Sequence, residues 1–127
     1  SECCLMVAVN EGTEAILLAD PLELTELKDW GEVAVPLGAP SSRQSGVLTF
    51  RRGDGASETG MWQCTPGRWR CDVQRDEFCY FLAGEAIYTP DSGAPFVVRA
   101  GIAATFPAGW KGVCEVRQTV RKVYMVR

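Results

Sequence analysis

Carboxylates and thiols are the side chains of this sequence that could do chemistry, because its 127 residues contain no histidine. Without imidazole, Ser-His-Asp and Cys-His nucleophilic catalysis and histidine metal sites are excluded. Glu77 is the candidate general acid or base. Cys79 lies two residues further on and shares its face of an extended strand. The chemical hypothesis is therefore a carboxylate and thiol site that is nucleophilic or binds a soft metal ion.

The six cysteines form no C-x-x-C pair, so neither a zinc ribbon nor a thioredoxin-type motif is present. In a reducing compartment we expect them to be mostly free thiols. The alternative to a thiol site is that buried cysteines fill the core as small hydrophobic residues, and this alternative is favoured for thiols far from cations. The cysteines are Cys3, Cys4, Cys64, Cys71, Cys79 and Cys114.

Charge and length limit the function classes. A net charge of −3 argues against a nucleic-acid partner, and we interpret the basic residues between Arg117 and Arg127 as the solvated face of a strand. No apolar run reaches the length of a membrane span, and residues 1–12 lack the pattern of a secretory signal. We therefore expect a soluble cytoplasmic protein without a membrane or nucleic-acid partner.

Short alternating runs separated by glycine and proline turns predict an all-β sandwich or barrel. The run 77–83 is apolar on both faces, which predicts a central strand that is covered on both sides. The predicted strands are 47–51, 58–64, 68–73, 77–83, 87–89, 96–98, 102–106, 113–116 and 119–126.

The N-terminal third is less regular. Residues 5–9 and 15–19 are candidate edge strands, so residues 1–20 would flank the main fold. Asp20, followed by proline and then glutamate, favours a short helix as far as Lys28, or else an extended segment that lays its leucines on the barrel. Residues 35–45 are rich in Pro, Gly and Ser and predict a loop inside a single domain, 1–127.

Two spacings in the central stretch resemble the paired motifs of the cupin superfamily. Glu77 lies seven residues before Gly84, and Gly101 lies six before the turn at 107–109. The stretches GMWQCTPGRW, DEFCYFLAGE and FPAGWKG resemble the small single-domain branch related to ureidoglycine aminohydrolase and the ethanolamine-utilisation cupin, over about residues 21–127. The resemblance implies an all-β double-stranded β-helix, or jelly-roll barrel, with one pocket.

Metal-binding cupins carry a His-x-His pair, a glutamate and a later histidine, and this chain keeps only the glutamate, Glu77. The other positions fall on Arg70 and Asp72 for one spacer length, on Cys71 and Val73 for the other, and on Gly112. A lone carboxylate does not hold a divalent ion tightly, so we expect no metal or other cofactor. The alternative is a metal bound through Glu77 and cysteines.

If the resemblance holds, several side chains should face the pocket beside Glu77. Trp110 and Lys111 follow the turn at the barrel mouth, and Cys114 shares a face with Gly112. The candidate ligand-binding residues are Arg70, Cys71, Asp72, Cys79, Trp110, Lys111 and Cys114.

Two competing interpretations remain for neighbouring residues. Glu77 could instead form a structural ion pair with Arg70, Arg68 or Lys111. Trp62 and Trp69 could wall the pocket, although core packing is favoured for both.

The leading functional prediction is a small-molecule-binding cupin-like protein of undetermined activity, with an unknown small polar ligand. One alternative, which the resemblance to ureidoglycine aminohydrolase implies, is a metal-independent or weakly metal-dependent enzyme in which Glu77 acts as acid or base on a small polar nitrogen-containing substrate. A second alternative is a structural or regulatory homodimer whose barrel is only a core. An open barrel edge gives a physical reason to expect a homodimer.

Overall fold

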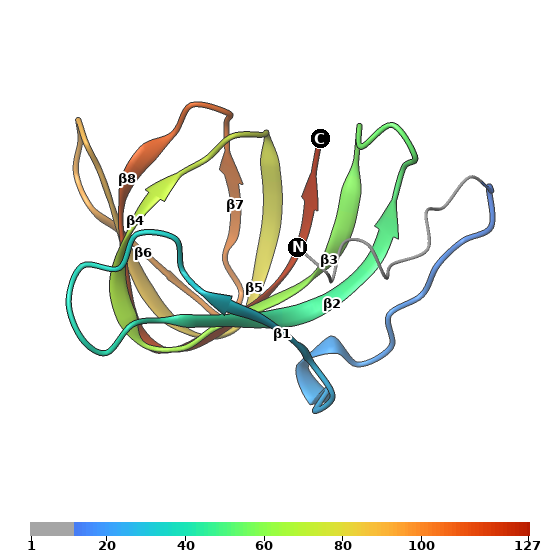
Figure 1. Ribbon diagram of the computed structural model, residues 1–127, viewed down its shortest axis with the longest axis horizontal. Coiled ribbons are helices and arrows are strands. Elements are labelled where there is room, and N and C mark those ends of the chain that lie inside the picture. The colour runs from blue at the N-terminus through green and yellow to red at the C-terminus, as the bar shows by residue number, and fades with distance from the viewer. Residues whose placement is uncertain (1–11) are drawn as a thin grey trace.

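Eight antiparallel strands wrap into a barrel in the computed structural model, which describes residues 12–127 (Figure 1). One short 3₁₀ helix precedes the strands within that range. The elements are η1 (Pro21–Glu23), β1 (Lys28–Glu32), β2 (Arg43–Arg51), β3 (Glu58–Cys64), β4 (Gly67–Asp72), β5 (Glu77–Pro90), β6 (Phe96–Arg99), β7 (Ala103–Phe106) and β8 (Lys111–Val126).

Two long strands, β5 and β8, join the two halves of the barrel. The strand order is β1-β2-β3-β8-β5-β6, while β4 also pairs with β8 and β7 also pairs with β5. The first part of β8 pairs with β4 and its last part pairs with β3. Predicted strands 87–89, 113–116 and 119–126 are therefore portions of these two strands rather than separate elements. This arrangement is the jelly-roll barrel that the motifs imply.

Gly84 lets β5 bend without ending. Its φ of 83° lies in the left-handed region, and a Cβ built on it would be 2.1 Å from the Thr119 carbonyl oxygen of β8. The pairing register of β5 and β8 shifts at several points between Phe81 and Ala86. Gly84, which the sequence predicted to separate two strands, instead forms a bend inside the continuous strand β5.

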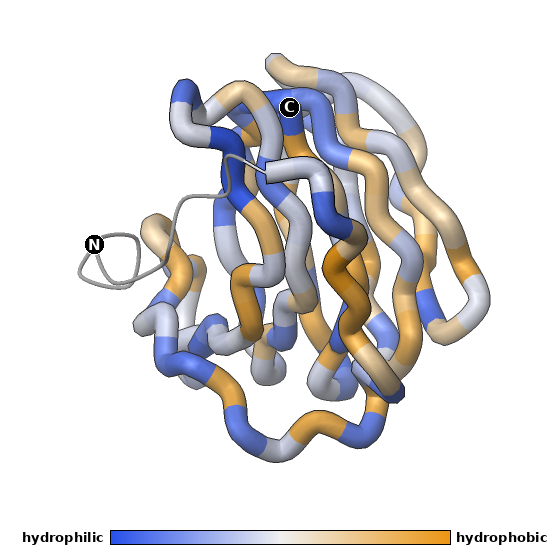
Figure 2. Tube along the Cα trace, turned by 90° about the vertical axis from the view of Figure 1, so that its right-hand side faces the viewer, coloured by the Kyte–Doolittle hydropathy of each residue, from blue (hydrophilic) through white to orange (hydrophobic). Residues whose placement is uncertain are grey.

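Apolar and polar residues are interspersed along the strands, as the hydropathy colours of Figure 2 show. Because successive side chains of a strand point to opposite faces, alternation separates the interior of the barrel from its surface. Buried apolar side chains fill part of the barrel interior and form the core. The fully buried members include Cys64, Cys79, Phe81, Val98, Cys114 and Val120.

The outer face of β5 differs from the sequence prediction. Phe78 is 56% exposed and Tyr80 is 43% exposed, although this strand pairs with β8 on one side and β7 on the other. The strand is central in the sheet, but residues 12–127 cover only one of its faces.

The segment before β1 lies along the outside of the barrel. The Arg121 guanidinium donates hydrogen bonds to the carbonyl oxygens of Pro21, Leu22 and Leu24, and to the Gln63 side chain. The prediction of a solvated basic face, made for Arg117, Arg121, Lys122 and Arg127, is therefore wrong for Arg121, which holds this segment against β3 and β8. It is also wrong for Lys122, which is buried inside the barrel.

Several N-terminal predictions need adjustment. Residues 15–19 form no strand, and the helix is limited to the three residues of η1, so the extended alternative describes most of 20–28. The sequence did not predict β1, and β2 begins at Arg43, inside the predicted loop. The predicted strand 5–9 lies outside the described residues.

Within residues 12–127 no helix is long and apolar enough to cross a membrane.

Candidate functional site

A cavity of about 250 Å³ occupies the part of the barrel that the packed core leaves open. Its wall combines aromatic rings with a small number of polar groups. The lining residues are Gln44, Glu58, Trp62, Trp69, Cys71, Val73, Glu77, Tyr88, Phe106, Lys122, Tyr124 and Val126. Of the sequence-predicted site residues, Glu77 and Cys71 are in this wall.

Strand alternation explains how these side chains converge. Residues two apart on β3, β4 and β8 point to the same side, so Trp69, Cys71 and Val73 follow one another along the wall. On β8 the same rule places Lys122 and Tyr124 inward, whereas Arg121 between Val120 and Lys122 points outward.

Glu77 is paired, but with none of the partners that the sequence suggested. Lys122 Nζ lies 2.6 Å from Glu77 Oε2, and both side chains are largely buried. The ammonium also lies 4.4 Å from the ring centroid of Trp62 and 5.7 Å from that of Phe81. Burial alone would lower the pKa of Lys122, but the adjacent Glu77 carboxylate, together with Cys79 and Cys71, outweighs burial and raises the pKa above the ordinary lysine value.

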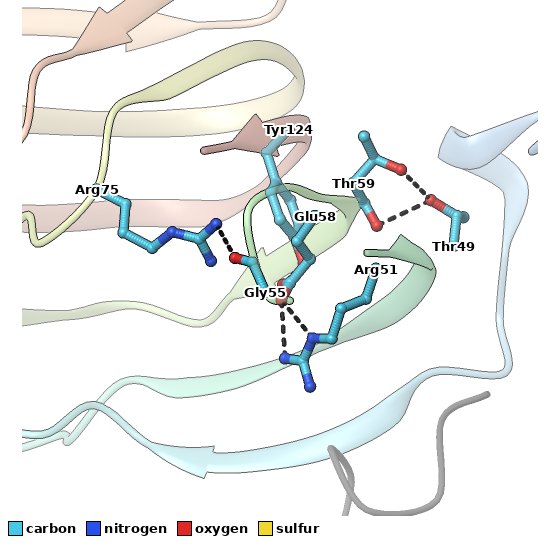
Figure 3. A network of polar contacts seen from close by, with 7 residues as sticks. All are labelled: Thr49, Arg51, Gly55, Glu58, Thr59, Arg75 and Tyr124. Atoms are coloured by element: carbon cyan, nitrogen blue, oxygen red, sulfur yellow. Dashed lines mark hydrogen bonds and ion pairs between the residues drawn. The ribbon is translucent and has the colours of Figure 1, made fainter. Parts of the chain in front are cut away.

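A second carboxylate in the wall, Glu58, belongs to the network drawn in Figure 3. Its Oε1 accepts from Arg51 Nη2 at 2.8 Å, and its Oε2 accepts from the Tyr124 hydroxyl at 2.9 Å. Nearby, Arg75 donates to the Gly55 carbonyl oxygen at 2.6 Å. These contacts fix Glu58 and Tyr124 in place beside the cavity.

Of the three β4 residues predicted to bind a ligand, Cys71 lines the cavity, whereas Arg70 and Asp72 do not. Arg70 forms a surface ion pair with Asp91, in which Nη1 lies 2.6 Å from Oδ1, and Asp72 is exposed. Burial raises the pKa of the Cys71 thiol to about 11, so this thiol is protonated at neutral pH.

Cys79 and Cys114 are buried in the packed core and are not part of the cavity wall. The Cys79 thiol donates a weak hydrogen bond to the Ala104 carbonyl oxygen at 3.7 Å. Burial raises the pKa of Cys79 to about 11 and that of Cys114 to about 12. Their placement matches the core-filling interpretation of these cysteines.

Trp110 supports the cavity from behind instead of facing it. The centroid of its ring lies 5.3 Å from that of Phe106 and 6.0 Å from that of Tyr88, and Phe106 and Tyr88 are both part of the cavity wall. Lys111 is exposed and pairs in register with Asp72. Both residues follow the turn at 107–109 as expected, but neither lines the cavity.

The sequence interpretation missed several wall residues. Trp62 and Trp69 satisfy both interpretations that the sequence left open. Trp62 belongs to the core cluster and Trp69 packs against it, and both also line the cavity, with their ring centroids 6.4 Å apart. Because every second residue of a strand faces the same side, Glu58 and Trp62 lie on one face of β3, and Lys122, Tyr124 and Val126 lie on one face of β8. This rule could have grouped these wall residues from the sequence. Gln44 gives no such signal, because its strand was predicted to begin later.

The residues present do not fit the metal of metal-binding cupins. Among residues 12–127, no group of three or more His, Cys, Asp or Glu side chains is arranged to hold a metal ion. At Gly112, the last ligand position, a Cβ would be 2.4 Å from the Thr89 carbonyl oxygen and 2.6 Å from the Trp110 ring. The positive charge beside Glu77 is supplied by Lys122.

Solved structures share this fold. The EutQ protein of Clostridium difficile is 20% identical with a TM-score of 0.58, and the match covers 74% of this chain and 79% of that chain. A putative ethanolamine utilization protein Q from Salmonella typhimurium is 17% identical with a TM-score of 0.57, covering 91% of this chain and 97% of that chain.

A DUF861 family protein of unknown function from Pseudomonas syringae reaches a TM-score of 0.73 at 18% identity, over 82% of this chain and 45% of that one. No functionally curated protein matches the sequence. The EutQ-like cupin domain, however, matches residues 51–124, more than half of the chain. This chain therefore belongs to the EutQ-like cupin family.

Proposed function

We propose that this protein binds a small polar organic molecule in the barrel cavity. The observation that carries the proposal is the cavity itself, in which aromatic rings and a few convergent polar groups enclose about 250 Å³. This composition is typical of small-molecule sites.

The wall offers distinct contacts to such a ligand. Trp62 and Trp69 present ring surfaces, and the Trp69 indole N–H is buried with no hydrogen-bond partner among the residues described. Lys122 carries three N–H donors, of which Glu77 engages one. A ligand with an oxygen acceptor would therefore satisfy groups that the protein leaves available.

A cavity-filling variant tests the proposal. Hits from a fragment screen by ligand-observed NMR should lose binding in Cys71→Phe, because the new ring occupies the cavity. Asp72→Phe is the matched control, since Asp72 is exposed on the neighbouring position of β4. Equal binding by both folded variants would contradict a ligand site in the cavity, and so would the absence of hits for the wild type.

The second candidate function is an enzyme in which Glu77 transfers a proton. It is favoured by the position of this carboxylate in the cavity wall, where Lys122 holds it in place. For any substrate that is found, Glu77→Gln should lower kcat by about 100-fold or more, while Asp91→Asn on the surface should leave it unchanged. Unchanged turnover in Glu77→Gln would remove Glu77 from catalysis.

A further inference from the structure

The charged groups of the cavity wall are balanced in pairs. Glu77 is neutralised by Lys122, whose Nζ lies 2.6 Å from its carboxylate. Glu58 is neutralised by Arg51, with 2.8 Å between Nη2 and Oε1. Glu58, Glu77 and Lys122 are the charged residues of the lining. Each of these two pairs joins one positive and one negative side chain, so the charges within each pair cancel.

The remaining ionisable groups of the wall carry no charge at neutral pH. The Cys71 thiol has its pKa raised to about 11 by burial. Burial also raises the pKa of both wall tyrosines, Tyr88 and Tyr124, above the ordinary phenol value. The wall therefore keeps no spare charge that could neutralise an ion brought in by a ligand.

A charged ligand would be poorly compensated in this cavity. Moving an ion from water into an aromatic-walled pocket is costly unless a partner charge awaits it, and here the charged side chains of the wall are already paired. An uncharged ligand avoids that cost. A carbonyl oxygen would accept from the Lys122 ammonium or from the Trp69 indole N–H, while the rings of Trp62 and Trp69 cover a planar group.

We propose that the cavity selects uncharged carbonyl compounds over carboxylates and cations, and that the Glu77–Lys122 pair sets this selectivity. The inference rests on the proposed small-molecule-binding function and adds the charge class of the ligand. In this arrangement Lys122 is a tethered cation that donates to the ligand, and Glu77 cancels its net charge. Removing either partner should therefore change which ligand charge is accepted.

Three probes of nearly the same shape test the selectivity directly. Benzamide, benzoate and benzamidinium each place a planar head group on one aromatic ring, with charges of 0, −1 and +1. Titration calorimetry or ligand-observed NMR at pH 7 should show that wild-type protein binds benzamide at least about tenfold more tightly than either ion. Equal or tighter binding of benzoate or benzamidinium would overturn the inference and leave the proposed function standing.

Variants of the pair give the second arm. Glu77→Gln leaves Lys122 without its counter-charge and should shift the preference to benzoate, whereas Lys122→Met should shift it to benzamidinium. The double variant is charge-balanced again and should return to benzamide, which keeps the test usable if a single variant does not fold. Asp91→Asn, which breaks the surface pair with Arg70, is the matched control and should keep the wild-type order.

The results separate the two claims. Unaltered probe preference in folded Glu77→Gln and Lys122→Met would overturn the role of the pair. Failure of all three probes with the wild type and every folded variant would contradict both this inference and the cavity as a small-molecule site.

Discussion

Lys122 is enclosed by the barrel with 7% of its surface exposed, and its charge is held by one carboxylate and two aromatic rings. A buried ion pair contributes little net stability compared with apolar residues of similar volume, but breaking it leaves an uncompensated charge. The large cost of removing one partner applies to the buried Glu77–Lys122 pair and not to a surface pair such as that between Arg70 and Asp91.

Lys122→Met should lower the free energy of unfolding by about 3 to 5 kcal/mol, because Glu77 then remains buried without a counter-charge. Urea denaturation followed by circular dichroism measures the change. The double variant with Glu77→Gln should recover most of the loss. Additive effects of the two substitutions would show that the groups are not energetically coupled.

The buried thiols predict alkaline destabilisation. Burial raises the pKa of Cys64, Cys71 and Cys79 from 9.0 to about 11, so the unfolded chain loses these protons first as the pH rises. Stability should therefore fall from about pH 9 upward, by roughly 1 kcal/mol per thiol at pH 10. The raised pKa of Lys122 acts in the same direction at still higher pH, where the ammonium loses its proton.

Thermal melts at pH 7, 9 and 10 measure this effect. Cys79→Val should flatten the pH dependence by about one thiol's share while keeping the core filled. A melting temperature that stays constant up to pH 10 would contradict the assignment of these thiols as buried and protonated.

At the scale of elements, β5 and β8 build the site because each crosses both halves of the barrel. Glu77 lies at the start of β5 and Tyr88 near its end, and both line the cavity. One strand can supply both only because it bends at Gly84, where β8 passes too closely for any side chain.

Gly84→Ala should therefore destabilise the protein strongly, by at least about 2 to 3 kcal/mol, since it combines a left-handed φ with a backbone clash. Gly101→Ala is the matched control, because its φ of 94° is also left-handed but nothing lies within 4 Å of the added Cβ. It should cost about 1 to 2 kcal/mol. Equal losses in urea denaturation would contradict the close approach of β8.

At the scale of the whole molecule, one outer sheet face carries apolar side chains that the described part of the chain leaves exposed. Phe78, Tyr80 and Met125 are between 43% and 56% exposed, and Phe78 pairs in register with Met125, while Tyr80 pairs with Val123. Neutral side chains continue this face onto β7, where Ala103 is the partner of Tyr80. The homodimer expected from the sequence stays a prediction, and this face gives it a location, because a two-fold interface joins the same patch on two copies.

Phe78→Asp should convert such a dimer to a monomer, since it would bury a charge at the centre of the interface. Sedimentation velocity measures the oligomeric state. Leu37→Asp, at an exposed apolar residue of the loop between β1 and β2, should leave it unchanged. A wild-type protein that is monomeric at high concentration would rule out this assembly.

The sequence alone determined the fold class and part of the site. Period-two alternation and the glycine and proline positions are local properties, so they identified the strands of an all-β sandwich or barrel. The resemblance of the Glu77–Gly84 spacing to a cupin motif implied the jelly-roll barrel and the inward position of Glu77. The absence of histidine, a fact of composition, excluded imidazole chemistry.

Only the tertiary structure decided which inward-facing residues meet and which are separated. Glu77 and Lys122 are 45 positions apart in the chain, and their contact depends on how β5 and β8 pair, which no local pattern specifies. Cys79 shares a face with Glu77, yet it packs in the closed core because position along the strand decides whether a side chain reaches the cavity. Alternation determines on which side of the sheet a side chain lies. Which other side chains lie beside it, and so whether they form a site, depends on the pairing of strands that are distant in the sequence.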